Sequence, residues 1–218
     1  GKTGWLECHA GESFFRVFYK FLDTGEKNDT HFMVFYFMDR TDVEKAMKAC
    51  DEARPVFCLI RIDNVPEVTA DLTDVERSAL LSDVTEKVLS SFNAKEGFIK
   101  QYSTNDFVAC ISHKALAEMM ENNFEILDAV RAIHTVNRIP VTLSIGIVQS
   151  SDSFMKQFEE TQVSLDLALG RGGDQAIVRL GKEVKAFGGK SPTSVSSTRV
   201  RVRVVAQALK EIIEDADM

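Results

Sequence analysis

The feature that most constrains the fold is an aromatic stretch near the N-terminus. Residues 31–38 (HFMVFYFM) and residues 13–22 (SFFRVFYKFL) are rich in Phe, Tyr and Val. The turn-forming residues 23–29 (DTGEKND) separate them, and this pattern predicts an antiparallel hairpin. Residues 5–8 predict a third short strand. Three strands are too few for an independent core, so we expect residues 1–40 to be part of a larger domain.

The rest of the chain alternates between helical and extended patterns. Predicted helices span residues 41–53, 73–92, 114–134 and 153–169, and predicted strands span 56–62, 98–102, 106–112, 141–147, 176–179 and 183–187. Thr73 and Glu76 have the spacing of a capping box at the start of the second helix. This order predicts an α+β (α/β-like) fold in which helices flank a mixed sheet.

The helix predicted over 153–169 has Phe154, Phe158, Leu165 and Leu169 on one side, which we expect to be its buried side. The residues that follow, 170–173 (GRGG), allow two interpretations. A phosphate-binding loop would need a Lys-Ser/Thr pair and would precede a helix. A helix C-cap that turns into the next strand is the favoured interpretation.

The C-terminal part begins with a Gly/Ser/Pro-rich linker, residues 185–197. Residues 198–205 alternate as in a strand, but their apolar spacing continues as a helix to Ile213, and we favour the helix. Three arginines in this segment suggest either a membrane or phosphate contact or a solvated helix face, and the solvated face is favoured. They are Arg199, Arg201 and Arg203.

Composition excludes several classes of function. The 218 residues carry a formal net charge of −7 with 44% apolar residues, which is typical of a globular protein and argues against a general nucleic-acid binder. The four cysteines form no CxxC pair and the four histidines are scattered, so no zinc site is predicted. No run of 18 apolar residues is present, so this stretch is not expected to span a membrane.

Four segments, in their order and spacing, resemble the GGDEF domain, which is the fold of diguanylate cyclases. They are residues 60–64 (IRIDN), 102–107 (YSTNDF), 142–147 (TLSIGI) and 167–175 (LALGRGGDQ). Residues 167–175, with two later segments, resemble one subfamily closely: the GdpP-like cyclic-di-AMP phosphodiesterases of Gram-positive bacteria. The later segments are residues 187–190 (FGGK) and 198–203 (TRVRVR).

Proteins of that subfamily have two transmembrane helices, a PAS domain, a degenerate GGDEF domain and a DHH/DHHA1 phosphodiesterase. Residues 36–41 (YFMDRT) are similar to the end of a PAS domain. The resemblance therefore implies four parts: the C-terminal part of a PAS domain, a linker helix, a degenerate GGDEF domain, and a linker and helix that lead to a DHH domain. Their expected bounds are residues 1–40, 41–54, 55–182 and 183–218.

The resemblance also implies partners, cofactors and a location. The partners would be the PAS and DHH/DHHA1 domains of the same polypeptide and a second copy in a homodimer, with no nucleic acid. The membrane would be reached only through the helices that precede this stretch, on the cytoplasmic side. Haem would require the complete PAS domain, and Mn²⁺ would belong to the DHH domain. His31 is not expected to be a haem ligand.

The resemblance implies that GTP cyclisation is lost. Arg61 and Asn105 stand where the family has its two Mg²⁺-binding carboxylates, and a cation or an amide holds Mg²⁺ poorly. The guanine-binding Asn and Asp of the family correspond to Thr69 and Ser78. The family's phosphate-binding Lys corresponds to Gly170, with Arg171 as a substitute.

Three residues remain as nucleotide-binding candidates: Asp63, Asp106 and Arg171, with ATP and Mg²⁺ or Mn²⁺ as the expected ligand. Asp106 is also the weak candidate for slow ATP hydrolysis. The other interpretation is structural and is the favoured one: Asp63 and Asn64 cap a turn, and Asp106 is a solvated hairpin residue. The preferred function is a regulatory module of a cyclic-di-AMP phosphodiesterase, and the rival is a stand-alone nucleotide cyclase or ATPase.

Overall fold

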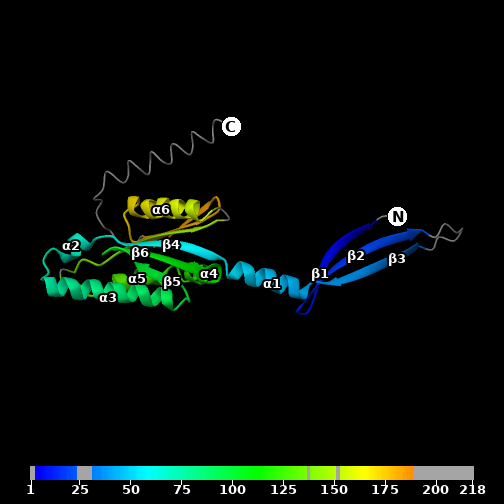
Figure 1. Cartoon of the computed structure of the whole chain (residues 1–218), viewed down its shortest axis with the longest axis horizontal. Coiled ribbons are helices and arrows are strands. Elements are labelled where there is room, and N and C mark those ends of the chain that lie inside the picture. The colour runs from blue at the N-terminus through cyan, green and yellow to red at the C-terminus, as the bar shows by residue number, and fades with distance from the viewer. Residues whose placement is uncertain (1–2, 24–30, 137, 151–152, 189–218) are drawn as a thin grey trace, which may run out of the picture. The chain divides into compact units, whose positions relative to one another are not determined.

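The computed structural model describes residues 3–23, 31–136, 138–150 and 153–188. The chain divides into two compact units, Gly1–Ala53 and Arg54–Met218. Figure 1 shows the helices and strands of both units. No helix formed by the described residues has the length and apolar character that a membrane crossing requires.

The first unit is a three-stranded antiparallel sheet followed by one helix. The strands are β1 (Thr3–Ala10), β2 (Ser13–Asp23) and β3 (His31–Asp39), in the order β1-β2-β3. The helix is α1 (Thr41–Glu52). The predicted hairpin, third strand and helix are thus confirmed.

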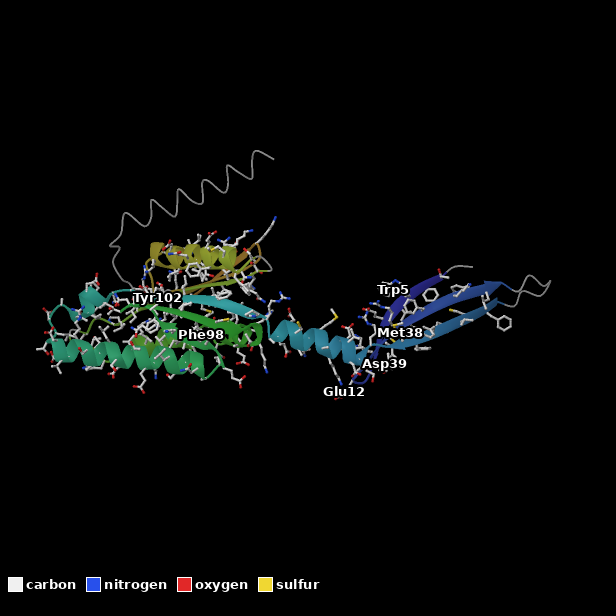
Figure 2. All side chains as sticks on the ribbon, in the orientation of Figure 1. Trp5, Glu12, Met38, Asp39, Phe98 and Tyr102 are labelled. Atoms are coloured by element: carbon white, nitrogen blue, oxygen red, sulfur yellow. The ribbon has the colours of Figure 1, made fainter. Side chains whose placement is uncertain are left out.

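The sheet of the first unit leaves most of its apolar side chains exposed. Among the described residues of this unit, only Val17 is a buried hydrophobic residue. Trp5, Phe18 and Tyr36 are register partners across the three strands, and they are 59%, 38% and 62% exposed. Figure 2 shows Trp5 and Met38 on this sheet. The described part of this unit therefore leaves these apolar side chains uncovered.

The second unit is a six-stranded mixed sheet with helices on both faces. The strands are β4 (Pro55–Ile62), β5 (Phe98–Gln101), β6 (Asp106–Ser112), β7 (Leu143–Gln149), β8 (Gln175–Leu180) and β9 (Glu183–Gly188). Their order is β5-β6-β4-β7-β8-β9. Strands β7 and β8 are parallel and the other neighbours are antiparallel.

The helices of this unit are α2 (Val65–Thr69), α3 (Asp74–Asn93), α4 (His113–Glu121), α5 (Glu125–Arg131) and α6 (Phe154–Gly170). Helix α6 lies on one face of the sheet, and α3, α4 and α5 lie on the other (Figure 1). The predicted capping box forms at α3, where the Thr73 hydroxyl accepts from the Glu76 N–H and the Glu76 carboxylate accepts from the Thr73 N–H. The α+β fold is confirmed.

One predicted helix is divided. The segment predicted as a single helix over 114–134 forms α4 and α5, because Asn123 and Phe124 have φ of 50° and 54° and cannot continue a right-handed helix. The Phe124 side chain is 1% exposed. Its burial in the core helps to offset the cost of that backbone conformation.

The predicted buried side of α6 is wrong for Phe154 and Phe158, which are 68% and 43% exposed. The buried side is made by Gln157, Thr161, Ser164, Leu165 and Ala168. The reason is Gly146 of β7: a Cβ atom there would lie 2.4 Å from the Leu165 nitrogen and 2.5 Å from the Thr161 oxygen. Because the α6 backbone lies directly on β7, mostly small and polar side chains fit between them.

The sheet extends beyond the expected domain boundary at residue 182. Strand β9 pairs with β8 from Glu183 to Gly188, so the strand predicted over 183–187 is confirmed. The expected start of the linker at residue 183 is therefore wrong, because these residues belong to the sheet. The rest of the predicted linker, the helix predicted to Ile213 and the three arginines Arg199, Arg201 and Arg203 lie outside the described residues.

Candidate functional site

The candidate residues gather at one end of the second unit's sheet, where β4 ends and β6, β7 and β8 begin. Arg61 of β4 is the register partner of Asp106 on β6 and of Ser144 on β7, and Ser144 is the register partner of Gln175 on β8. These strand ends bring together residues that are far apart in the sequence.

The central interaction is an ion pair between Arg61 and Asp106. Arg61 Nε lies 2.5 Å from Asp106 Oδ1, and Ser103 Oγ donates to Asp106 Oδ2 at 2.6 Å. Partial burial acts to lower the pKa of Arg61, but the hydrogen bond to Asp106 outweighs it and the pKa is raised. Arg61 is therefore charged, and both oxygens of Asp106 are occupied. The Asp106 side chain is only 15% exposed, so the interpretation of Asp106 as a solvated hairpin residue is wrong.

Asp63 lies two residues further along the chain and makes a different contact. Its Oδ2 accepts a hydrogen bond of 3.0 Å from the backbone N–H of Asp174. Desolvation by the surrounding protein raises the pKa of Asp63 to about 6, although the hydrogen bond from Asp174 favours the ionised form. Asp63 thus connects the end of β4 to the turn between α6 and β8.

That turn is a helix C-cap, as the sequence favours. The Gly172 N–H donates to Leu169 O and the Gly173 N–H donates to Ala168 O, which is the hydrogen-bond pattern of a Schellman motif. Gly173 has φ of 75°, and a Cβ there would lie 2.6 Å from Asp63 Oδ2. Since the N–H groups of residues 172–174 all donate within the protein, they do not form a phosphate-binding loop.

Arg171 is the C-cap residue of α6. Its Nε donates to Gln175 Oε1 at 3.0 Å. Among the described residues, no hydrogen bond or ion pair joins Asp106 to Asp63 or Arg171. The three candidates therefore lie at the same end of the sheet without forming one connected cluster.

Thr69 and Ser78, which correspond to the guanine-binding positions, have separate surroundings. The Thr69 hydroxyl donates to Val65 O at 2.7 Å, and the residue is 8% exposed. Ser78 lies on an exposed part of α3. Neither side chain offers the amide or carboxylate that pairs with guanine.

Two interactions at this end of the sheet have no signal in the sequence. Asp174 is 1% exposed and its Oδ1 is 3.0 Å from Arg131 Nη2 of α5. Asn64 Nδ2 donates to Pro140 O at 2.8 Å, and Asn64 Oδ1 accepts from the Thr142 N–H. The partners in these contacts are 43 to 78 residues apart, so no local motif signals them. Asn64 is the N-cap residue of α2, but its side chain makes no capping hydrogen bond. It binds instead to the backbone of the segment that leads into β7, so the interpretation of Asn64 as a turn cap is wrong.

No group of three or more His, Cys, Asp or Glu side chains within the described ranges could hold a metal ion.

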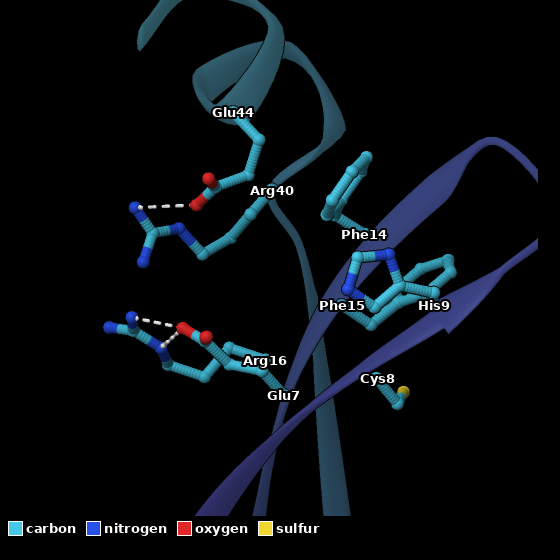
Figure 3. Close-up of a pocket in the computed structure, with 8 residues that line it drawn as sticks. All are labelled: Glu7, Cys8, His9, Phe14, Phe15, Arg16, Arg40 and Glu44. Atoms are coloured by element: carbon cyan, nitrogen blue, oxygen red, sulfur yellow. Dashed lines mark hydrogen bonds and ion pairs between the residues drawn. The ribbon is translucent and has the colours of Figure 1, made fainter. Parts of the chain in front are cut away.

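The first unit has a hollow of about 140 Å³ (Figure 3). The charged residues on its wall pair with one another: Arg16 Nη2 with Glu7 Oε1 at 2.6 Å, and Arg40 with Glu44 at 3.4 Å. These pairs leave no uncompensated charge for a ligand.

Comparisons with known proteins identify the family to which this chain belongs. Residues 60–186 match the family model described as "Cyclic-di-AMP phosphodiesterase GdpP-like, GGDEF domain". The chain belongs to the GdpP-like GGDEF family. The match includes both Arg61 and Asp106 and extends into β9, so the family's GGDEF domain passes the boundary expected at residue 182.

Two curated relatives are similar to most of this chain. It is 37% identical to cyclic-di-AMP phosphodiesterase PdeA of Listeria monocytogenes and 38% identical to cyclic-di-AMP phosphodiesterase GdpP of Bacillus subtilis. Each match covers 84% of this chain and 28% of the relative. The chain thus spans little more than a quarter of the length of these multidomain relatives.

Two solved structures have a similar fold. The active GGEEF domain of a diguanylate cyclase from Vibrio cholerae superposes with a TM-score of 0.50 at 13% identity, covering 62% of this chain and 88% of that chain. The GGDEF domain of DgcB from Caulobacter crescentus, in complex with c-di-GMP, gives 0.50 at 14% identity, covering 63% and 83%. These likenesses show the GGDEF fold and nothing about activity.

Proposed function

We propose that this chain is a regulatory part of a larger cyclic-di-AMP phosphodiesterase, and that its GGDEF domain does not cyclise GTP. The first half of the proposal is supported by the family and by the curated relatives, of which the chain spans 28%. The second half depends on the chemistry at the end of β4.

The Arg61–Asp106 ion pair is the observation that supports the second half of the proposal. A metal-ligating carboxylate is expected at position 61, and the chain has a guanidinium there, 2.5 Å from Asp106 Oδ1. A divalent cation at this place would be repelled by Arg61 and would compete with it for Asp106. Asn105 offers a neutral amide at the second metal position, which is a weaker ligand.

Incubation of the chain with GTP and Mg²⁺, followed by chromatography of the products, tests this proposal. We expect no cyclic-di-GMP, while an active diguanylate cyclase in parallel forms it. Cyclic-di-GMP made by the chain, in proportion to its concentration, would refute the proposal and favour the rival function of a stand-alone cyclase.

The parent protein would hold the remaining parts of the expected architecture. In this proposal, the first unit is the end of a PAS domain, and a DHH/DHHA1 domain with Mn²⁺ hydrolyses cyclic-di-AMP on the cytoplasmic side of the membrane. The 218 residues alone would then not hydrolyse cyclic-di-AMP in the presence of Mn²⁺. Hydrolysis by the purified chain would contradict this arrangement.

We propose weak ATP binding as a second function. Two carboxylates that can bind a metal ion and one arginine that can bind phosphate lie at one end of the sheet. Asp63 and Arg171 flank the α6–β8 turn, and Asp106 lies on β6. Since Asp106 is paired with Arg61, any metal bound with ATP must displace Arg61, so binding is expected to be weak. Calorimetry with ATP and Mg²⁺ or Mn²⁺ should give a small heat that Asp106→Ala removes. No heat, or an equal heat in Asp106→Ala, would refute it.

A further inference from the structure

An open groove of about 470 Å³ lies between α3 and α5 of the second unit. Both helices lie on the same face of the sheet and pack against each other (Figure 1). One wall of the groove is formed by Ala129 of α5 and by Ala132 and Ile133, which follow the end of that helix. Because alanine side chains are short, they leave room beside α3 for the side chains of a bound segment. This wall of the groove is apolar.

The opposite wall of the groove belongs to α3 and carries uncompensated negative charge. Asp83, Glu86 and Lys87 line it, and all three are exposed. Asp83 and Glu86 are three residues apart, so they lie on the same side of the helix. Among the described residues, neither carboxylate takes part in an ion pair or a side-chain hydrogen bond. The two carboxylates outweigh the charge of Lys87, so this wall repels phosphate groups and suits a cationic segment.

The last described residue, Gly188, lies beside α5. A Cβ atom at Gly188 would be 2.6 Å from Leu127 Cδ1 of that helix. The centre of the neighbouring Phe187 ring is 5.1 Å from that of Phe124, the N-cap residue of α5. Arg199 comes eleven residues after Gly188, and a chain of that length spans up to roughly 36 Å. A helix is only about 10–12 Å across, so the chain that follows Gly188 can pass α5 and reach the groove.

The chain that follows β9 carries the chemistry that matches the groove. Residues 184–210 contain no Asp or Glu. Within them, residues 198–205 (TRVRVRVV) alternate three arginines with valines. A guanidinium binds a carboxylate through paired N–H groups, and the intervening valines can cover apolar surface. Since this stretch contains no carboxylate, its arginines can be paired only with carboxylates from elsewhere in the protein.

We propose that residues 198–205 bind in the groove between α3 and α5 of the same molecule. Their arginines pair with Asp83 and Glu86, and their valines lie against the alanine wall. The three arginines are then ion-paired and do not form a solvated helix face. The segment of the same chain is favoured over that of a second copy, because its connection to Gly188 gives it a high effective concentration at the groove. Bound there, it fixes the point at which residues 206–218 leave the domain.

Trypsin cleavage within the segment, followed by mass spectrometry, measures this binding in the full 218-residue chain. The enzyme cuts after Arg199, Arg201 and Arg203 only when these residues are free, so its rate reports the unbound fraction. Asp83→Asn with Glu86→Gln removes both charges and keeps the side-chain sizes. At low ionic strength this double variant should be cut in the segment at least about threefold faster than the wild type. At about 0.5 M NaCl the difference should shrink, because salt screens exposed charges. Equal rates at low ionic strength would refute the proposal.

The matched control is Glu159→Gln with Glu160→Gln on α6, which lies on the other face of the sheet. It makes the same change of net charge away from the groove. Its segment should be cut at the wild-type rate. An equal acceleration by this control would mean that net charge, and not the groove, controls cleavage, and the proposal would be wrong.

Disulfide formation locates the segment directly. In a chain that keeps only the buried Cys58, Ser90→Cys places a thiol on the α3 wall of the groove. Val200, Val202 and Val204 are then changed to Cys one at a time. Mild oxidation should link at least one of them to position 90 within the same molecule, as a disulfide-linked peptide pair identified by mass spectrometry.

In the control for this experiment, Gln162→Cys replaces Ser90→Cys, because Gln162 is exposed on α6. The yield of the link to position 162 should be at least about tenfold lower than that of the best link to position 90. Equal yields, or no link from position 90 to any of the three valine positions, would refute binding in the groove. A covalent dimer in place of the internal link would show that the segment enters the groove of a second copy, and the intramolecular assignment would be overturned.

Discussion

Strands of similar apolar composition have opposite surroundings in the two units. In β4 of the second unit, Val56, Cys58, Ile60 and Ile62 are 0–1% exposed. In β3 of the first unit, every residue from Phe32 to Met38 is 41–62% exposed. The second unit supplies helices for both faces of its sheet, whereas the described part of the first unit supplies one short helix. Apolar composition therefore predicts a strand, but it does not tell which molecule or segment covers it.

The largest expected effect comes from removing an aromatic ring in each unit. Phe92→Ala should lower the free energy of unfolding of the second unit by about 3–5 kcal/mol, because Phe92 is 0% exposed and its loss leaves a cavity. Phe37→Ala, at a position 62% exposed, should cost less than about 1 kcal/mol. Urea unfolding followed by circular dichroism measures both. Equal costs would mean that the first unit has a core of its own.

The second prediction concerns a carboxyl in each unit. Burial raises the pKa of Asp63 to about 6 from an ordinary 3.8. The stability that Asp63 contributes is therefore present below pH 3.8 and lost as the pH rises through about 6, by up to about 3 kcal/mol. Asp63→Asn keeps a hydrogen-bond acceptor for the Asp174 N–H and cannot ionise. Its stability relative to wild type should therefore increase between about pH 4 and about pH 7.5 in urea unfolding.

Asp39 in the first unit should show the opposite sign. The hydroxyl and the N–H of Thr41 hold the pKa of this exposed carboxyl below its usual value. Its contribution is present above the ordinary pKa and is lost as the pH falls through the lowered one. Asp39→Asn should therefore lose stability relative to wild type at neutral pH and recover in acid. The same sign for both variants would refute the assignment of their surroundings.

The third prediction compares two glycines with equally close neighbours. A Cβ at Gly146 would lie 2.4 Å from the backbone nitrogen of Leu165, and a Cβ at Gly4 would lie 2.4 Å from the Tyr19 hydroxyl oxygen. Backbone in a packed helix cannot yield, so Gly146→Ala should cost about 1–3 kcal/mol. Tyr19 is partly exposed and the tip of its side chain can move, so Gly4→Ala should cost less than about 1 kcal/mol. Thermal unfolding of the two variants distinguishes these cases, and a costlier Gly4→Ala would contradict the account.

The smallest expected effect lies at the helix starts. Thr73→Ala removes the capping box of α3 and should cost about 1 kcal/mol. Helix α1 has Arg40 at its N-cap without a side-chain capping hydrogen bond, so Arg40→Ala should change the unfolding free energy by about 0.5 kcal/mol or less. Chemical denaturation of both variants tests this comparison, and equal losses would argue that the cap does not stabilise α3.

Most of the fold was predictable from local sequence signals. The hairpin of the first unit followed from its aromatic stretches and turn residues, and the start of α3 followed from Thr73 and Glu76. The errors arose where tertiary contacts override local pattern. The exposed positions of Phe154 and Phe158 depend on the close approach of α6 to Gly146, and no local periodicity contains that contact.

The candidate site was predictable in part. The resemblance identified Arg61 and Asp106 as important positions, but only the register of β4 and β6 shows that they form an ion pair. The role of Asp63 at the α6–β8 turn was hidden because its partner, Asp174, is 111 residues away. The Arg131–Asp174 pair was missed for the same reason.

Metal-dependent binding of GTP is the decisive measurement, because in the proposed function Arg61 stands in the place of a divalent cation. Calorimetry of the chain with GTP in the presence and absence of Mg²⁺ makes the measurement, with Arg61→Asp and Asn105→Asp combined as the matched variant. We expect no Mg²⁺-dependent heat from the wild type and a measurable one from the double variant. Mg²⁺-dependent binding of GTP by the wild type, with Arg61 in place, would contradict the account.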